Sequence, residues 1–193
     1  MFNKDYFYSK NYYNMNGLCL YLFGRSGSGK TTIANQLKNK LINYDKRIVT
    51  ELDGDELRKY IGQDLGFSKK DRSINIRRIG YVANIIVNNN GIALVSNIAP
   101  YIDDREYNKN LIENNNNKYV DIFINTSLKE CMKRDPKGLY NINNERIIQS
   151  YNEFEEPKKD NCKLRINTDN QKISYNTDEI FNYLIKNNYL YKK

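Results

Sequence analysis

The chain has 193 residues, a formal net charge of +8 at pH 7 and no histidine. This length suits one domain with a substantial buried core and is short for two, so we expect a single domain. The longest apolar runs fall far short of the roughly 20 residues that a membrane helix needs, and no basic segment followed by an apolar one opens the chain. We therefore expect a soluble, cytoplasmic protein with no membrane partner.

The positive charge alone does not point to a nucleic-acid partner. The lysines are scattered along the sequence, and a protein that binds small polyanions also benefits from a positive potential. Cys19, Cys131 and Cys162 are odd in number and widely spaced, and the absence of histidine excludes the usual mixed zinc sites. We expect no nucleic acid to bind, and three reduced thiols without a role.

From Leu18 onward, apolar runs typical of strands alternate with helical stretches. The predicted strands are residues 18–23, 47–53, 92–98, 119–125 and 163–167. The predicted helices are residues 31–43, 71–89, 103–113, 127–135 and 177–186. Near-continuous apolar strands, each followed by a helix, predict a mainly parallel sheet between helices, a three-layer α/β fold.

Two segments lie outside this alternation. Residues 1–16 carry aromatics without a regular period, so we expect an N-terminal extension that is either disordered or docked on the body. Residues 17–193 then form the single domain. The polar region of about residues 137–160 is too short to separate two domains and suggests a lid over a site.

A phosphate-binding loop lies at residues 24–31, which match G-x-x-x-x-G-K-[ST] between the first strand and its helix. The glycines let successive N–H groups face phosphates, and the helix N-terminus adds partial positive charge. Lys30 would reach the β and γ phosphates, and the Thr31 hydroxyl would bind Mg²⁺. A glycine-rich turn that binds nothing is the alternative, but the strand, loop and helix in register favour ATP and a P-loop NTPase fold. The predicted ATP-binding residues are Gly24, Arg25, Ser26, Gly27, Ser28, Gly29, Lys30, Thr31 and Thr32.

Two carboxylates, Asp53 and Asp55, end the second strand. Since ligands bind at the carboxyl ends of parallel strands, both could face the phosphates. A carboxylate there can join the Mg²⁺ shell or accept the proton of an attacking hydroxyl, and Arg58 could pair with an anionic acceptor. An ordinary strand-to-helix turn with an acidic N-cap explains these residues equally well.

The following stretch favours the functional interpretation. Phe67, Arg72, Asn75, Arg77 and Arg78 combine a planar aromatic with several donors, as a nucleotide with a base and phosphate oxygens would require. The arginines could equally form a solvated helix face.

Together the motifs resemble those of adenylylsulfate kinases, which phosphorylate the 3′-hydroxyl of adenosine 5′-phosphosulfate. The motifs are LDGDELR, DLGFSKKDRSINIRR, IAPY with DR shortly after, and RDPKGLY, in the same order and at similar spacing between about residues 18 and 140. The resemblance implies a P-loop kinase core with ATP as co-substrate, Mg²⁺, and a homodimer. The interpretation of residues 24–31 as a phosphate-binding loop rests on those residues themselves and does not depend on the resemblance.

The resemblance also implies a role for individual residues. Asp55 looks like the catalytic carboxylate, with Asp53 as its companion and Lys30 offsetting charge on the transferred group. The residues that look like substrate contacts are Arg58, Arg72 and Asn75 for the phosphosulfate, Phe67 for the adenine, Ile98 through its backbone, and Lys137, Gly138 and Leu139 at the start of the lid.

This sequence departs from the family pattern in two regions, the stretch around IAPY and the lid. Ala99 stands where many members have serine, Ile102 stands where an arginine often follows the aromatic, and the lid after RDPKGLY is shorter, with Tyr151 a candidate for its aromatic. A kinase with another acceptor, such as cytidine diphosphoramidate, is therefore one alternative. A regulatory domain that binds a nucleotide without turnover is another, although the intact Lys30, Thr31 and Asp55 argue against it.

Overall fold

The computed structural model describes residues 15–135, 138, 140, 153–158 and 162–193. The strands in these residues are β1 (Leu18–Phe23), β2 (Val49–Asp53), β3 (Ile92–Asn97), β4 (Lys118–Asn125) and β5 (Leu164–Asn167). The helices are α2 (Lys30–Tyr44), α3 (Gly54–Ile61), α4 (Lys69–Asn88), α5 (Ile102–Glu113), α6 (Leu128–Arg134) and α8 (Ile173–Lys186). Much of the predicted lid and residues 1–14 of the predicted N-terminal extension lie outside the described residues.

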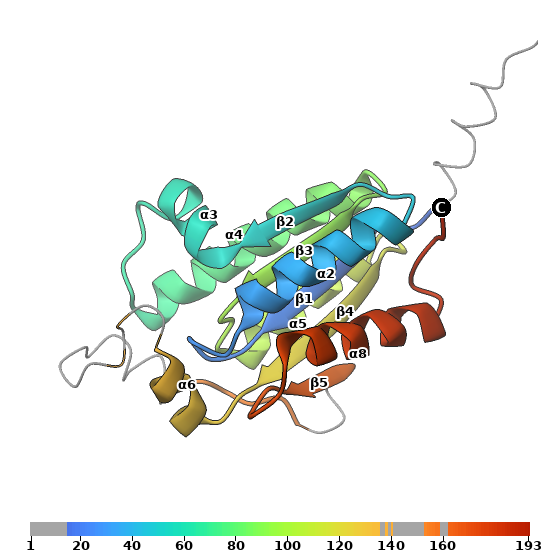
Figure 1. Cartoon of the computed structure of the whole chain (residues 1–193). Coiled ribbons are helices and arrows are strands. Elements are labelled where there is room, and N and C mark those ends of the chain that lie inside the picture. Colours follow the sequence, from blue (N-terminus) through green and yellow to red (C-terminus); the bar gives the residue numbers. More distant parts are fainter. Residues whose placement is uncertain (1–14, 136–137, 139, 141–152, 159–161) are drawn as a thin grey trace, which may run out of the picture.

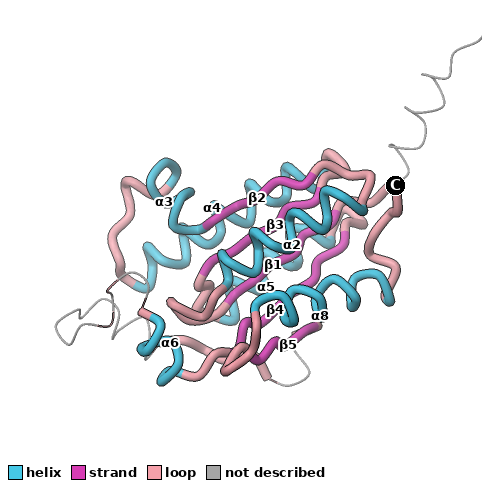
Figure 2. Tube along the Cα trace, in the orientation of Figure 1, coloured by secondary structure: helices cyan, strands magenta, loops and turns pink. Residues whose placement is uncertain are grey.

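The five strands form one parallel sheet in the order β2-β3-β1-β4-β5 (Figure 2). Leu18 at the start of β1 is in register with both Ile92 of β3 and Lys118 of β4. Because all strands run the same way, their carboxyl ends lie along one edge. The segments that follow β1, β2 and β3 therefore meet there.

The two faces of the sheet bury separate hydrophobic clusters. Leu20 and Leu22 of β1 face the cluster formed with α2 and α8, whereas Tyr21 and Phe23 face the cluster formed with α4 and α5. This alternation follows from the two-residue period of a strand. Figure 1 shows α2 and α8 in front of the sheet and α4 and α5 behind it. The predicted three-layer α/β fold is confirmed.

Two helices differ from the prediction. α8 begins at Ile173, four residues before the predicted start, and Lys172 at its N-cap makes no side-chain cap hydrogen bond. The usual sequence signal for a helix start is therefore missing. α3 occupies residues 54–61, for which no separate helix is predicted; it is short and is capped by the Asp53 side chain.

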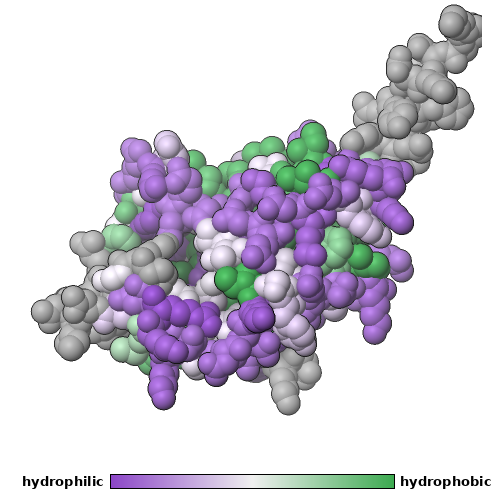
Figure 3. Space-filling model, viewed as in Figure 1, coloured by the Kyte–Doolittle hydropathy of each residue, from purple (hydrophilic) through white to green (hydrophobic). Residues whose placement is uncertain are grey.

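No helix among the described residues is long and apolar enough to cross a membrane. The face formed by α2 and α8 is mostly hydrophilic, with apolar atoms along the edge over β2 and α4 (Figure 3). Ile48, which precedes edge strand β2, is 74% exposed.

Candidate active site

The glycine-rich loop connects β1 to α2 at the carboxyl edge of the sheet. Gly27 and Gly29 have φ angles of +74° and +96°, a region that side chains with a Cβ rarely occupy. Gly29 is also the N-cap of α2, so the first N–H groups of the helix open toward the loop. The chain between these glycines curls as an anion-binding loop requires.

Lys30, the first residue of α2, is buried. Its Nζ donates hydrogen bonds to the carbonyl oxygen of Arg25 at 2.7 Å and to Ser28 Oγ at 3.3 Å. Both acceptors belong to the loop. The ammonium group is thus held within the curve of the loop, next to the helix N-terminus, where a phosphate would sit.

Asp53 joins the second strand to the phosphate loop. Its Oδ2 accepts hydrogen bonds from Thr31 Oγ1 at 2.8 Å and from Ser96 Oγ at 3.1 Å. Its Oδ1 accepts from the backbone N–H groups of Asp55 and Glu56, so the residue also caps α3. The N-cap interpretation is therefore confirmed for this residue, and the same side chain also contacts the phosphate loop.

The charge of Asp53 is stabilised by these contacts. Partial burial raises the pKa of its carboxyl, but the hydrogen bonds from Thr31, Glu56, Ser96 and Asp55 together outweigh burial, and the pKa lies below its usual range. The group is therefore an anion at neutral pH. It places a full negative charge beside the Thr31 hydroxyl.

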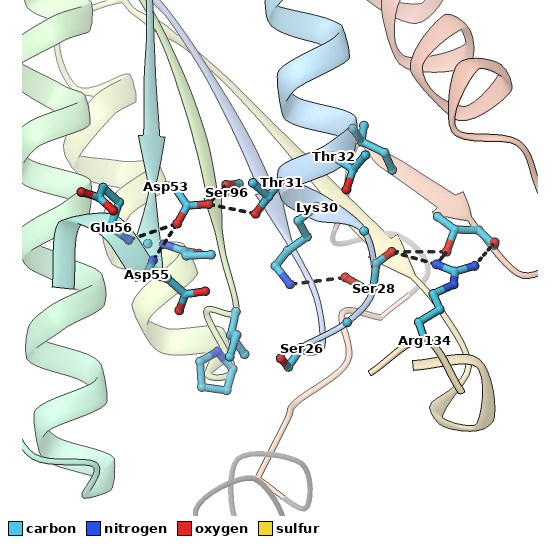
Figure 4. A pocket seen from close by; sticks show the side chains of 18 of the residues that line it. Ser26, Ser28, Lys30, Thr31, Thr32, Asp53, Asp55, Glu56, Ser96 and Arg134 are labelled. Atoms are coloured by element: carbon cyan, nitrogen blue, oxygen red, sulfur yellow. Dashed lines mark hydrogen bonds between the residues drawn. The ribbon is translucent and has the colours of Figure 1, made fainter. Parts of the chain in front are cut away.

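Asp55 lies in the first turn of α3 and lines the same cavity as Lys30. Figure 4 shows the side chains of Asp55 and Lys30 on facing sides of the pocket. The hydrogen-bonded side chains of Asp53, Ser96 and Thr31 lie beside them. A carboxylate that faces a phosphate loop across a cavity can accept a proton from a hydroxyl bound between them.

Hard oxygen donors suitable for Mg²⁺ gather at the centre of the site. The hydroxyls of Thr31 and Ser96 surround one oxygen of Asp53. Among the described residues, no group of three or more His, Cys, Asp or Glu side chains could hold a metal ion. The set therefore fits a magnesium ion that takes one or two protein ligands and its remaining ligands from phosphates and water.

Beyond Asp55, the cavity is lined by a cationic and aromatic cluster. The guanidinium carbons of Arg58 and Arg72 lie 4.6 and 5.8 Å from the centroid of the Phe67 ring. Burial, followed by the positive charge of Arg72, lowers the pKa of Arg58, but an arginine remains charged at neutral pH. Two fixed positive charges thus lie over an aromatic ring whose residue is 42% exposed.

Asn75 completes this side of the cavity. It is buried, and among the described residues its Oδ1 has no hydrogen-bond partner. A buried acceptor of this kind usually meets a donor on a ligand or a water molecule. Ile98, the residue after β3, lines the cavity as well.

The cavity has a volume of about 1000 Å³ and unites the two sets of residues. Its lining includes Ser26 to Thr32, Asp53, Asp55, Arg58, Phe67, Arg72, Asn75 and Ile98. Of the other predicted site residues, Gly24, Arg25 and Gly138 do not line it. Lys137 and Leu139 lie outside the described residues.

Two arginines of the predicted nucleotide-binding cluster do not line the cavity. Arg77 pairs with Asp104 at 2.8 Å, and Arg78 pairs with Asp64 at 2.5 Å. Arg77 lies two residues after Asn75 and therefore on another face of α4. Arg78 lies three residues after Asn75, but its side chain is held by the pair with Asp64. For these two residues the expected contribution to the cluster is wrong.

The cavity has a further group of lining residues, on the side of the phosphate loop that faces away from Asp55, which was not predicted from the sequence. Arg134 of α6 donates to the carbonyl oxygen of Thr168 at 2.7 Å and to its hydroxyl at 3.2 Å. Both residues line the cavity, together with Asn170 and Gln171. The carboxyl end of β5 was the available signal, because ligands bind at that end of parallel strands.

Comparisons with known proteins identify relatives over most of the chain. Residues 16–166 match the sequence model of a family described as adenylylsulphate kinase. The chain is 38% identical to an adenylyl-sulfate kinase of Rippkaea orientalis, with 91% of this chain and 96% of the relative covered. It is 36% identical to the adenylyl-sulfate kinase of Staphylococcus epidermidis, with 89% and 85% covered.

A solved structure agrees with these sequences. The Mycobacterium tuberculosis APS kinase CysC in complex with AMPPNP and APS matches with a TM-score of 0.76 and 30% identity, over 88% of this chain and 98% of that one. The residues that the family model matches include the phosphate loop, the acidic pair and the arginine cluster. The chain belongs to the adenylylsulfate kinase family.

Proposed function

We propose that the chain is an ATP-dependent kinase that phosphorylates the 3′-hydroxyl of adenosine 5′-phosphosulfate to give 3′-phosphoadenosine 5′-phosphosulfate. The observation that carries the proposal is the single cavity, in which the phosphate loop faces Asp55 and the cluster of Arg58, Phe67 and Arg72. The relatives named adenylyl-sulfate kinase support the choice of acceptor.

The donor half binds the triphosphate through its main chain. The N–H groups of the loop and the first turn of α2 would hold the β and γ phosphates, and the Lys30 ammonium, held within the loop, would contact them as well. Because these donors are fixed before the reaction, they stabilise the charge on the transferred group without further rearrangement. We assign the predicted ATP-binding residues Gly24 to Thr32 to this half.

Magnesium would be held by Thr31, with Asp53 and Ser96 in support. When bound, the ion would supply positive charge that offsets the negative charge of the phosphates. Asp53 stays ionised because of its hydrogen bonds, so it accepts the hydrogen bond of the Thr31 hydroxyl and leaves the lone pairs of that oxygen for the ion. This arrangement needs no change in protonation at neutral pH.

Asp55 would act as the catalytic base. The acceptor hydroxyl oxygen forms a bond to the γ phosphorus while the bond from that phosphorus to the bridging oxygen of ADP breaks. The hydroxyl proton passes to the Asp55 carboxylate. The products are ADP and the phosphorylated acceptor, and Asp55 returns its proton to solvent.

The acceptor half would recognise an anionic nucleotide. Arg58, Arg72 and the amide Nδ2 of Asn75 would supply donors for phosphosulfate oxygens, and the Phe67 ring would contact the adenine. Ile98, which lines the cavity, is a further proposed contact. Lys137, Gly138 and Leu139 are proposed contacts on the resemblance alone. Ala99 and the shorter lid leave a different acceptor as the competing outcome.

A panel of acceptors tests this function. Purified protein with magnesium and ATP is offered adenosine 5′-phosphosulfate or cytidine diphosphate derivatives in parallel, and ADP release is followed. We expect turnover with the sulfated adenosine compound. Turnover with a cytidine compound alone would replace the acceptor, and nucleotide binding without any turnover would support a regulatory domain.

We also propose a cytoplasmic homodimer. The family resemblance implies the dimer, and the exposed Ile48 beside edge strand β2 offers apolar surface for an interface. Light scattering on the purified protein should give twice the mass of one chain. A monomeric mass at micromolar concentration would contradict the dimer.

A further inference from the structure

The tip of the phosphate loop is contacted from two sides by segments far away in sequence. Tyr140 Oη donates a hydrogen bond to the carbonyl oxygen of Ser26 at 2.6 Å. Glu156 Oε1 accepts one from Arg25 Nη1 at 2.8 Å, across 131 positions of the sequence. The loop is therefore braced by other parts of the fold as well as by its own strand and helix.

Arg25 is the more buried partner of its ion pair with Glu156. The side chain of Arg25 is 17% exposed and that of Glu156 48% exposed. The guanidinium of Arg25 also lies over the ring of Phe154, 4.9 Å from its centroid. Phe154 is buried and stacks on Phe123 of β4. The aromatic platform holds the arginine plane in one orientation, which favours a persistent ion pair.

The segment that presents Glu156 is itself fixed. The backbone N–H of Glu155 donates a hydrogen bond to the carbonyl oxygen of Pro100 at 2.9 Å. Its side-chain Oε2 accepts one from the backbone N–H of Ile102 at 2.7 Å. Arg105 donates to the carbonyl oxygen of Glu155 at 2.7 Å. Glu156 is thus attached to the turn after β3, and it can act as a fixed point for the phosphate loop.

Arg25 connects Glu156 to Lys30 through two hydrogen bonds. Its side chain binds Glu156, and its carbonyl oxygen accepts the Lys30 ammonium at 2.7 Å. We propose that Glu156 is a positioning residue, which holds Arg25 so that the loop carbonyl and the Lys30 ammonium are already placed for the phosphates of the nucleotide. This inference rests on the donor site of the proposed function and does not depend on the identity of the acceptor.

Calorimetric titration with magnesium and ADP, without any acceptor, tests the role directly. We expect Glu156→Gln and Arg25→Met each to weaken ADP binding about threefold, which corresponds to the loss of a partly exposed ion pair. Glu156→Gln should cause no further loss when combined with Arg25→Met or with Lys30→Ala. Asp178→Asn is the matched control, because it breaks an equally short but distant pair, Lys40 with Asp178, whose acid is 52% exposed.

Two results would overturn the proposal. The first is an ADP affinity of the Glu156→Gln protein equal to that of the Asp178→Asn protein. The second is a threefold loss from Glu156→Gln that persists in the Arg25→Met or Lys30→Ala background, which would show that Glu156 acts independently of the loop. Since the readout is ADP binding, a failure to phosphorylate the sulfated nucleotide would leave the result unaffected.

Discussion

The phosphate-loop end of the cavity is made largely of main chain, whereas the acceptor end is made of side chains. Lys30 and Thr31 are held by hydrogen bonds of 2.7 and 2.8 Å to the loop and to Asp53. At the other end, Phe67 is 42% exposed. Arg58 and Arg72 lie over its ring, and Arg72 also donates a hydrogen bond to its carbonyl oxygen at 2.8 Å.

This difference separates what is fixed by the fold from what is open to change. Main-chain donors recognise phosphate whatever side chains surround them, so the donor end suits any nucleoside triphosphate. The acceptor end depends on a few side chains whose replacement would alter the substrate. Substitutions at the two ends should therefore damage different kinetic constants.

Asp55→Ala should give the largest effect, because Asp55 stands between the two ends. Loss of a general base lowers turnover by about 10²- to 10⁴-fold. Affinity for magnesium and ATP should stay near the wild-type value. Steady-state kinetics with a parallel ATP titration measures both, and Asp103→Asn, which changes an exposed acid in the first turn of α5, is the control. Wild-type turnover of the Asp55→Ala protein would exclude Asp55 as the base.

Lys30→Ala should follow, with turnover reduced by about 10²- to 10³-fold as for other preorganised charge-stabilising donors. ATP affinity should fall as well, in contrast to Asp55→Ala, because the ammonium contacts the phosphates already in the ground state. Lys38→Ala on the same helix is the control, since Lys38 pairs with Glu51 rather than with the loop. Full activity of the Lys30→Ala protein would remove the phosphate loop from the mechanism.

Phe67→Ala should have a smaller effect, confined to the acceptor. Loss of a base-stacking face costs about 1–3 kcal/mol. The KM for the sulfated nucleotide should therefore rise about tenfold, whereas the KM for ATP should not change. Phe67→Tyr keeps the ring and should behave as wild type. An equal rise in both KM values would break the distinction between the two ends.

The smallest effect concerns the dependence of stability on pH. The pKa of Asp53 in the folded chain lies below its ordinary value of 3.8, so its hydrogen bonds stabilise the fold above that pH and lose this effect as the pH falls through the folded value. Asp53→Asn keeps an N-cap side chain. The Tm advantage of the wild type at pH 7 should therefore shrink below about pH 4. An advantage that is constant down to pH 3 would contradict the shift.

The donor end could be predicted from the sequence because its signals are local. Residues 24–31 contain the loop glycines, the lysine and the threonine in one run, and the adjacent strand and helix follow their expected periods. Asp53 and Asp55 were placed correctly at the carboxyl edge, because a parallel sheet brings strand ends together. The local motif and the strand order of the chain are enough to predict where these residues lie in the fold.

Other parts of the site depend on contacts between distant segments. Arg134 meets Thr168, and Arg25 meets Glu156, across gaps that no spacing rule reveals. Arg77 and Arg78 were grouped with Arg72 by sequence alone, although the turn of α4 directs them to other partners. The partners of these four arginines could therefore be identified only from the three-dimensional structure.

The position of the transferred phosphate tests the central claim most directly. The protein is incubated with magnesium, ATP and adenosine 5′-phosphosulfate, and the product is examined by phosphorus NMR and mass spectrometry. The arrangement of the loop, Asp55 and the arginine cluster predicts one new phosphate, on the 3′-hydroxyl, with one ADP formed for each product molecule. ADP release without a phosphorylated product, or a phosphate at another position, would contradict it.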